Sequence, residues 1–126
     1  MFSLKNKSAV ITGGGSGIGK AIAETFAKQG ARIYVLDLDL KNAEITVNGI
    51  INKQGEASAF ACDVSDQQLV KQVFEQISTI DILVNCAGIA HVGRADTTSE
   101  EDFDRIFRVN VKGTYNCLHA CKWFST

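Results

Sequence analysis

Short apolar runs alternate with longer amphipathic stretches along this chain. The short runs lack polar alternation, which is typical of strands buried on both faces of a parallel sheet. The longer stretches carry apolar residues three or four positions apart, as helices do. The predicted strands cover 9–12, 32–36, 57–61 and 82–84, and the predicted helices cover 18–29, 40–53, 66–77 and 99 onward. Four strand–helix repeats predict an α/β fold with a doubly wound parallel sheet.

Polar residues mark the starts of two of these helices. Ser65 with Gln68, and Thr98 with Glu101, match the capping box, in which a Ser or Thr caps the helix and a Glu or Gln follows three residues later. The sequence therefore predicts Ser65 and Thr98 as N-cap residues. The last helix, from Ser99, is predicted to be long.

The pattern describes a single domain over residues 1–126. A doubly wound dinucleotide fold normally has six strands in two halves. Here the alternation ends after the fourth strand and its helix, so we expect the front portion of a longer domain. Apolar surface left uncovered by such a cut predicts a homo-oligomer or other self-association, with the helix from Ser99 as the natural contact surface.

The composition excludes several functions. There are 13 Lys and Arg against 14 Asp and Glu, and without a basic run the chain lacks the electrostatic signature of a nucleic-acid binder. No apolar run approaches the roughly 20 residues of a membrane span, and the polar start is not a secretory signal, so a cytoplasmic protein is expected. His119 would point away from Cys117 and Cys121 on a helix, so we expect free thiols and no metal.

Five glycines stand between the first predicted strand and helix, within Thr12-Gly13-Gly14-Gly15-Ser16-Gly17-Ile18-Gly19. Glycines at such a junction permit a tight turn and close approach of backbone to phosphate, and the helix N-terminus favours a pyrophosphate. The spacing is not G-x-G-x-x-G, and a P-loop would need Ser or Thr where Ala21 stands. A nucleotide phosphate is expected, but the loop alone leaves a dinucleotide and S-adenosylmethionine both open.

Carboxylates follow the second and third predicted strands. Asp37 stands 24 positions after Gly13, close to the spacing at which a carboxylate meets an adenosine ribose and repels a 2′-phosphate. With a neutral Ser16, this favours NAD over NADP, and it requires Asp37 to lie near the mouth of the glycine loop. Asp37 can instead simply end its strand, and Asp63 is as readily a turn aspartate as an acceptor for an adenine amino group.

Four motifs resemble the short-chain dehydrogenase/reductase family in their order and separation: Thr12-Gly13-x-x-x-Gly17-Ile18-Gly19, Asp63-Val64, Asn85-x-Ala87-Gly88 and Asn110. The resemblance covers essentially the whole chain. It implies a Rossmann fold that binds NAD(H) or NADP(H), often in oligomers, and hydride transfer between nicotinamide and a small-molecule alcohol or carbonyl substrate. It also implies that Asp63 and Val64 form the adenine pocket.

The glycine loop, the strand ends and the resemblance together define the expected cofactor-binding residues. The resemblance implies that Asn85, Ala87 and Gly88 stabilise the fourth strand beside the cofactor. Cys86 stands where many members of the family carry Asn. His91 and Arg94 are expected in a solvated loop. The expected cofactor-binding residues are Gly13, Ser16, Gly17, Ile18, Gly19, Asp37, Leu38, Asp63, Val64, Asn85, Ala87 and Gly88.

Asn110 is the predicted catalytic residue. With Phe103, Phe107, Thr114 and Cys117 it is expected on one helix face, where a polar amide on an apolar stripe must find partners or cost about 1–3 kcal/mol. Such an amide can bond a backbone carbonyl at a helix distortion. The resemblance implies that it also holds a water in a proton relay leading to a catalytic lysine.

The family's catalytic Ser and its Tyr-x-x-x-Lys, in which the lysine lowers the pKa of the tyrosine, are not matched here. The tyrosines are Tyr34 and Tyr115, and four residues after them stand Leu38 and His119. The chain is therefore predicted to belong to an NAD-dependent oxidoreductase but to be inactive alone. A non-enzymatic dinucleotide-binding or partner-binding module is the alternative, and a methyltransferase is a third possibility.

Overall fold

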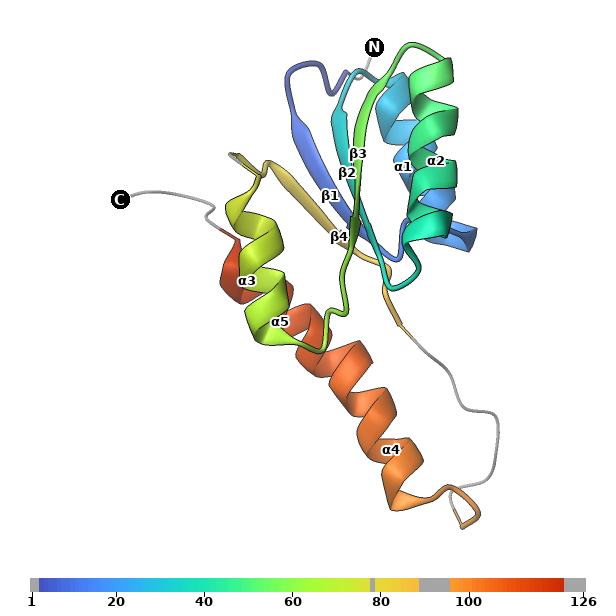
Figure 1. Cartoon of the computed structure of the whole chain (residues 1–126), viewed down its shortest axis with the longest axis vertical. Coiled ribbons are helices and arrows are strands. Elements are labelled where there is room, and N and C mark those ends of the chain that lie inside the picture. Colours follow the sequence, from blue (N-terminus) through green and yellow to red (C-terminus); the bar gives the residue numbers. More distant parts are fainter. Residues whose placement is uncertain (1–2, 78, 89–95, 122–126) are drawn as a thin grey trace.

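The computed structural model describes residues 3–77, 79–88 and 96–121, and the predicted loop residues His91 and Arg94 lie outside these ranges. Strands and helices alternate along the chain (Figure 1). The strands are β1 (Ser8–Thr12), β2 (Arg32–Asp37), β3 (Glu56–Ala61) and β4 (Ile82–Asn85). The helices are α1 (Gly17–Lys28), α2 (Leu40–Asn52), α3 (Gln67–Glu75), α4 (Glu100–Phe107) and α5 (Gly113–Ala120), with a π-helical turn η1 (Arg108–Lys112) between the last two.

The four strands form one parallel sheet in the order β3-β2-β1-β4. Val10 of β1 is paired with Tyr34 of β2 on one side and with Leu83 of β4 on the other. The chain winds outward from β1 to β3 and then crosses back to place β4 beside β1. This reversal of winding leaves a crevice at the carboxyl ends of β1 and β4, where open α/β sheets bind ligands. The predicted Rossmann-type α/β fold is confirmed.

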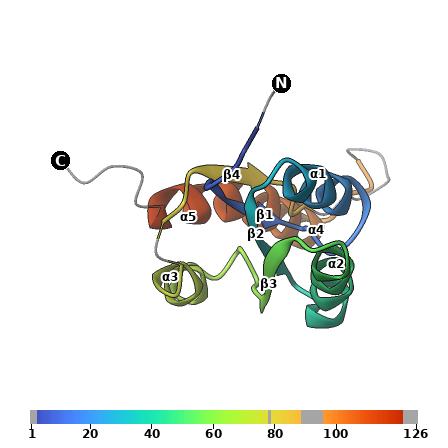
Figure 2. The ribbon, with the colours of Figure 1, turned by 90° about the horizontal axis from the view of Figure 1, so that it is seen from above.

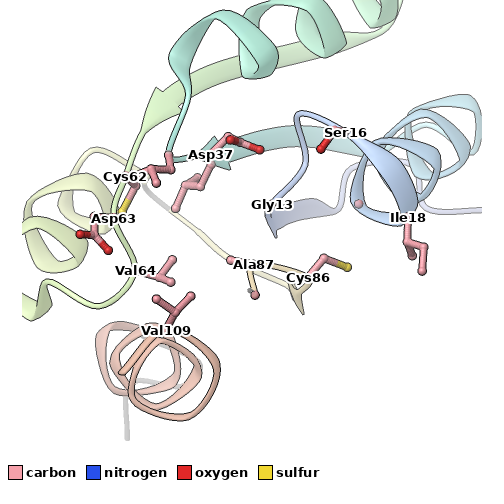
Figure 3. A pocket seen from close by; sticks show the side chains of 14 residues that line it. Gly13, Ser16, Ile18, Asp37, Cys62, Asp63, Val64, Cys86, Ala87 and Val109 are labelled. Carbon is pink, nitrogen blue, oxygen red and sulfur yellow. The ribbon is translucent and has the colours of Figure 1, made fainter. Parts of the chain in front are cut away.

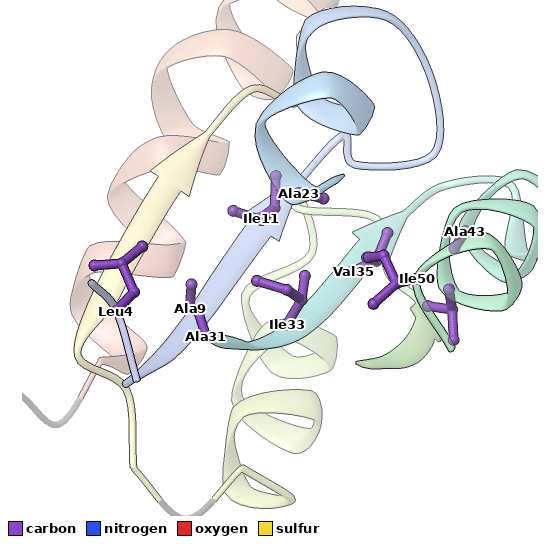
Figure 4. Packing of buried hydrophobic residues seen from close by; sticks show 10 residues of the cluster. Leu4, Ala9, Ile11, Ala23, Ala31, Ile33, Val35, Ala43 and Ile50 are labelled. Atoms are coloured by element: carbon purple, nitrogen blue, oxygen red, sulfur yellow. The ribbon is translucent and has the colours of Figure 1, made fainter. Parts of the chain in front are cut away.

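Helices cover both faces of the sheet, with α1 and α2 on one face and α3 and α5 on the other (Figure 2). Successive side chains of a strand point to opposite faces. Ile11 and Val35 therefore pack toward α1 and α2 (Figure 4), whereas Val10 and Leu36 pack toward α3 and α5, and all four are fully buried. The central strands are apolar on both faces, as predicted, because neither face meets water.

Both predicted N-caps are wrong by one residue. Asp66 caps α3, accepting a hydrogen bond from the amide of Leu69, whereas Ser65 donates its hydroxyl proton to Asp63 Oδ1 at 2.6 Å. The Asp63 carboxylate thus holds Ser65 in the turn and moves the helix start forward. Ser99, not Thr98, caps α4, since the extended backbone of Ser99 places its Oγ 3.1 Å from the amide of Asp102.

The π-turn η1 interrupts the last helix around Asn110, and α4 extends past the carboxyl edge of the sheet (Figure 1). A π-turn holds one residue more than an α-turn, which rotates the residues after it relative to those before it. Phe103 is 62% exposed and Phe107 52%, whereas Cys117 is fully buried. The predicted shared face holds for Phe103, Phe107 and Asn110, which line one surface hollow, but this part of the stripe is exposed and only Cys117, beyond the π-turn, is buried. Asn110 itself is exposed, so no desolvation cost applies to its amide.

Candidate functional site

A cavity of about 410 Å³ lies at the carboxyl edge of the sheet, where the winding reverses between β1 and β4 (Figure 3). This volume falls within the roughly 300–1,000 Å³ of small-molecule sites. Its lining includes ten of the twelve predicted cofactor-binding residues, all except Gly17 and Asn85. The complete lining is Gly13, Ser16, Ile18, Gly19, Leu36, Asp37, Leu38, Cys62, Asp63, Val64, Cys86, Ala87, Gly88 and Val109.

Gly13 and Gly19, at the two ends of the glycine loop, have no room for a side chain. Gly13 has a φ of 65°, and a β-carbon there would stand 2.8 Å from the amide nitrogen of Ala87. A β-carbon on Gly19 would collide with the carbonyl oxygen of Gly13. Glycine at both positions lets the first turn of α1 fold directly against the loop, which brings that helix end to the cavity.

The N-terminus of α1 has no side-chain cap. In the described part of the chain, α2, α3 and α4 each have a side chain that accepts a hydrogen bond from a first-turn amide, whereas Ser16 makes no such bond. The amide of Lys20 is the first in α1 that bonds back, to the carbonyl of Ser16 at 3.2 Å. The amides of residues 17–19 precede that bond, and the helix dipole makes this end electropositive. An anionic group in the cavity would satisfy both features.

Asp37 lies at the mouth of the glycine loop. Its Oδ2 accepts a hydrogen bond from the amide of Gly15 at 3.0 Å, and its Oδ1 accepts one from the amide of Asp39 at 3.0 Å. The carboxylate is thereby oriented toward the cavity that it lines (Figure 3). Each carboxylate oxygen keeps further acceptor capacity, so Asp37 can receive hydroxyl donors while it holds the loop.

A second residue holds the same loop and was not singled out from the sequence. Thr46 of α2 is buried, and its hydroxyl donates to the carbonyl of Gly14 at 3.0 Å. The amide of Gly14 also donates to the carbonyl of Leu36 at 3.3 Å. The polar backbone groups in the middle of the loop are therefore directed toward β2 and α2. The only sequence signal was a threonine on the same helix face as Ala43 and Ile50.

Thr12 joins the ends of β1 and β4. Its buried hydroxyl oxygen accepts hydrogen bonds from the amides of Cys86 and Ala87, each at 3.1 Å. These two amides follow the last residue of β4, and the Cys86 amide also donates to the Thr12 carbonyl at 3.2 Å. The bonds fix the floor of the cavity beneath the segment that ends at Gly88.

The turn after β3 forms the opposite end of the cavity. Asp63 Oδ1 accepts from the amide of Ser65 at 3.0 Å as well as from its hydroxyl, and Val64 is 5% exposed. Leu38 is 76% exposed, so an apolar side chain stands free at this end. Burial, reinforced by the nearby carboxylates of Asp63 and Asp66, raises the pKa of the Cys62 thiol to about 11. The thiol is therefore neutral near pH 7 and acts as an apolar wall.

Asn110 lies in η1, close to Gly88 but not in the cavity lining. A β-carbon built on Gly88 would stand 3.2 Å from Asn110 Oδ1, and the Asn110 carbonyl accepts the hydroxyl proton of Thr114 at 3.1 Å. The helix distortion expected at Asn110 is therefore present. The amide reaches the end of β4, where Gly88 enters the cavity.

The buried helical amide is Asn116, which the sequence reasoning did not single out. It is fully buried, donates to the carbonyl of Val64 at 2.9 Å and accepts from Gln67 at 3.2 Å. Its position three residues after Gly113 and next to Cys117, both buried, was the available signal.

The described residues contain neither a metal-binding cluster nor a membrane-spanning helix. No cluster of three or more His, Cys, Asp or Glu side chains there could hold a metal ion. None of the helices in the same ranges has the length and apolar character to cross a membrane.

Similarity to known proteins was found at the level of family, sequence and structure. The family model for short chain dehydrogenases matches residues 7–122. An uncharacterized oxidoreductase of Bacillus subtilis is 43% identical over 93% of this chain and 45% of its own length. The D-threitol dehydrogenase of Mycolicibacterium smegmatis is 39% identical over 94% of this chain and 47% of its own length.

A hydroxysteroid dehydrogenase from Escherichia coli has a solved structure that superposes with a TM-score of 0.88 at 34% identity. The superposition covers 94% of this chain and 52% of that one. The chain spans about half the length of the curated relatives that it matches.

Proposed function

Because the chain belongs to the short-chain dehydrogenase family, as its motifs predicted, we propose that residues 1–126 form one NAD-binding unit of an oxidoreductase. The reaction proposed is hydride transfer to or from a carbon of a small-molecule alcohol or carbonyl compound. The observation that carries the proposal is the meeting of the uncapped α1 N-terminus and the Asp37 carboxylate at one cavity. The helix N-terminus can bind an anionic diphosphate, and the nearby carboxylate can accept a hydrogen bond from a sugar hydroxyl of the same ligand.

The residues that line the cavity fit a dinucleotide. The electropositive amides of residues 17–19 would hold the diphosphate, and the apolar side chains of Leu38 and Val64 would contact the adenine ring. Asp37 would accept hydrogen bonds from the ribose hydroxyls. A 2′-phosphate would meet this negative carboxylate and no compensating positive charge at Ser16, which supports NAD over NADP.

The proposed catalytic role of Asn110 is to hold a water at the end of β4 near Gly88. When bound, the nicotinamide supplies or accepts the hydride. The chemistry also needs a proton donor, and the 126 residues contain no Tyr-x-x-x-Lys, since Leu38 and His119 stand four positions after the tyrosines. We therefore propose that this chain alone binds NAD without catalysing turnover.

Self-association is proposed through the helical segment that extends past the sheet. Phe103, Phe107, Val111 and Leu118 are each at least half exposed along α4, η1 and α5. Contiguous apolar exposure of this kind marks an interaction surface. The proposed partner is a second copy of the same chain.

The test is a fluorescence titration of the 126-residue chain with NADH and NADPH. The variant Asp37→Asn is compared with Asp39→Asn, which also removes one negative charge but lies outside the cavity lining. We expect NADH to bind more tightly than NADPH, and we expect this preference to shrink in Asp37→Asn only. Equal affinity for the two dinucleotides, or an unchanged preference in Asp37→Asn, contradicts the proposal. Protection against unfolding by S-adenosylmethionine and not by NADH would favour a methyltransferase.

A further inference from the structure

Helix α5 contacts Val64, in the turn after β3, in two ways. The first is a hydrogen bond, because the buried Asn116 donates its side-chain amide proton to the Val64 carbonyl at 2.9 Å. The oxygen of the same amide, Asn116 Oδ1, accepts a hydrogen bond from Gln67 Nε2 at 3.2 Å. The amide thus links α5 both to the turn and to the first residue of α3.

The second contact is steric. Gly113 lies one helical turn before Asn116, and a β-carbon at Gly113 would stand 2.6 Å from Val64 Cγ2. The absence of a side chain at Gly113 therefore allows the Val64 side chain to lie directly against the helix backbone. Two independent contacts therefore fix the position of Val64, one to its backbone and one to its side chain.

Val64 belongs to the buried cluster that also contains Val70 and Cys117, and α5 supplies the hydrogen bond to its carbonyl. The ladder between β2 and β3 ends at Ala61, and the bond from the Cys62 amide to the Asp37 carbonyl follows it. Beyond that point the turn is held by local bonds, from the amide and hydroxyl of Ser65 to the Asp63 carboxylate and from the Asp66 amide to the Asp63 carbonyl. Figure 3 shows Val64 between this turn and the helix that carries Val109, at the wall of the cavity.

We infer that Asn116 and Gly113 position Val64 as the wall of the adenine end of the cavity, so that they set the affinity for adenine nucleotides without touching them. This inference rests on the proposed function, in which the cavity takes a dinucleotide. Neither residue lines the cavity. Both act through Val64, and they are positioning residues.

Two substitutions separate the bond to Val64 from the bond to Gln67. Asn116→Asp keeps the size of the side chain and an acceptor for Gln67, but places an oxygen against the Val64 carbonyl. Gln67→Met removes the other bond of the same amide and leaves the donation to Val64 intact. We expect Asn116→Asp to weaken AMP and NADH binding by about three- to tenfold, the net value of one hydrogen bond. We expect Gln67→Met to change neither affinity by more than about twofold.

Gly113→Ala provides a readout that a general loss of stability cannot reproduce. Alanine is the better helix former, so the substitution favours α5, whereas its methyl group pushes Val64 toward the cavity. The gain in helix propensity offsets part of the cost of crowding Val64. We therefore expect the urea midpoint to fall by no more than about 1 M, while the affinity of the folded chain for AMP falls at least about threefold. If Asn116→Asp fails to fold, the affinity of Gly113→Ala for AMP alone tests the inference.

The measurement is competition of AMP against NADH fluorescence, with urea unfolding of each variant followed by circular dichroism. Wild-type affinity for AMP in both Gly113→Ala and folded Asn116→Asp overturns this inference but leaves the proposed function standing. A wild-type chain that binds neither NADH nor AMP overturns both. Equal losses in Asn116→Asp and Gln67→Met would also overturn it, because the bond to Val64 would then have no special role.

Discussion

Gly13 and Gly17 have the same unusual backbone conformation but different surroundings, which makes them a matched pair. Their φ angles are 65° and 56°, both in the left-handed region. A β-carbon at Gly13 would stand 2.8 Å from the Ala87 nitrogen and 2.9 Å from the Cys86 carbonyl atoms, whereas at Gly17 it would meet nothing within 4 Å. Replacing each by alanine therefore separates backbone strain from crowding against the end of β4.

The two substitutions differ in their expected cost to the free energy of unfolding. A left-handed conformation costs an L-residue about 1–2 kcal/mol, and both variants incur this cost. Overpacking a well-packed site adds about 1–3 kcal/mol, and only Gly13→Ala incurs it. The crowded atoms form the peptide group between Cys86 and Ala87, whose amide donates to Thr12, so relief by movement of this segment would weaken that bond as well. We expect about 2–5 kcal/mol for Gly13→Ala and about 1–2 kcal/mol for Gly17→Ala.

Urea unfolding followed by far-ultraviolet circular dichroism measures this difference. With a slope of about 2 kcal/mol per molar urea, Gly13→Ala should lower the midpoint by about 1–2.5 M and Gly17→Ala by about 0.5–1 M. The slope itself should stay unchanged, which shows that both variants unfold from the same compact state. Equal midpoint shifts would refute the reasoning, because crowding of Gly13 against Cys86 and Ala87 would then contribute nothing.

Three further predictions follow from other contacts. Thr46→Val should weaken NADH binding about three- to tenfold, because valine leaves the Gly14 carbonyl without its hydroxyl donor. Thr46→Ser keeps a hydroxyl and should weaken binding less. Equal NADH affinities of the two variants would contradict the role of that hydroxyl. Burial raises the pKa of the Cys62 thiol from 9.0 to about 11 and that of the Cys117 thiol to about 12, so thiolates form more readily in the unfolded chain. The urea midpoint should therefore be constant below about pH 9 and fall between about pH 9 and 11. A midpoint that rises over this range would have the wrong sign. Phe107→Glu should shift the chain toward monomer in sedimentation velocity, because it places a charge in the exposed apolar stripe; a monomeric wild type would exclude the proposed self-association.

The parallel α/β fold and the contents of the cavity lining were predictable from local patterns. The apolar strands, the glycines between β1 and α1, and the polar residues at strand ends are all readable one segment at a time. Parallel strands bring their carboxyl ends to one edge, so residues such as Gly13, Asp37 and Ala87 must lie near each other once the strand order is known. The local pattern and the family resemblance together predicted ten of the fourteen residues that line the cavity, all except Leu36, Cys62, Cys86 and Val109.

The tertiary structure decided how those residues are held. The N-cap of α3 moved to Asp66 because Asp63 captures Ser65, and the π-turn separated the buried Cys117 from the exposed Phe107. Hydrogen bonds between distant segments, such as Asn116 to Val64, join residues 52 positions apart. Local propensity carries no information on such pairs, since each partner is an ordinary polar or small residue until the packing of α5 against the sheet removes water from both.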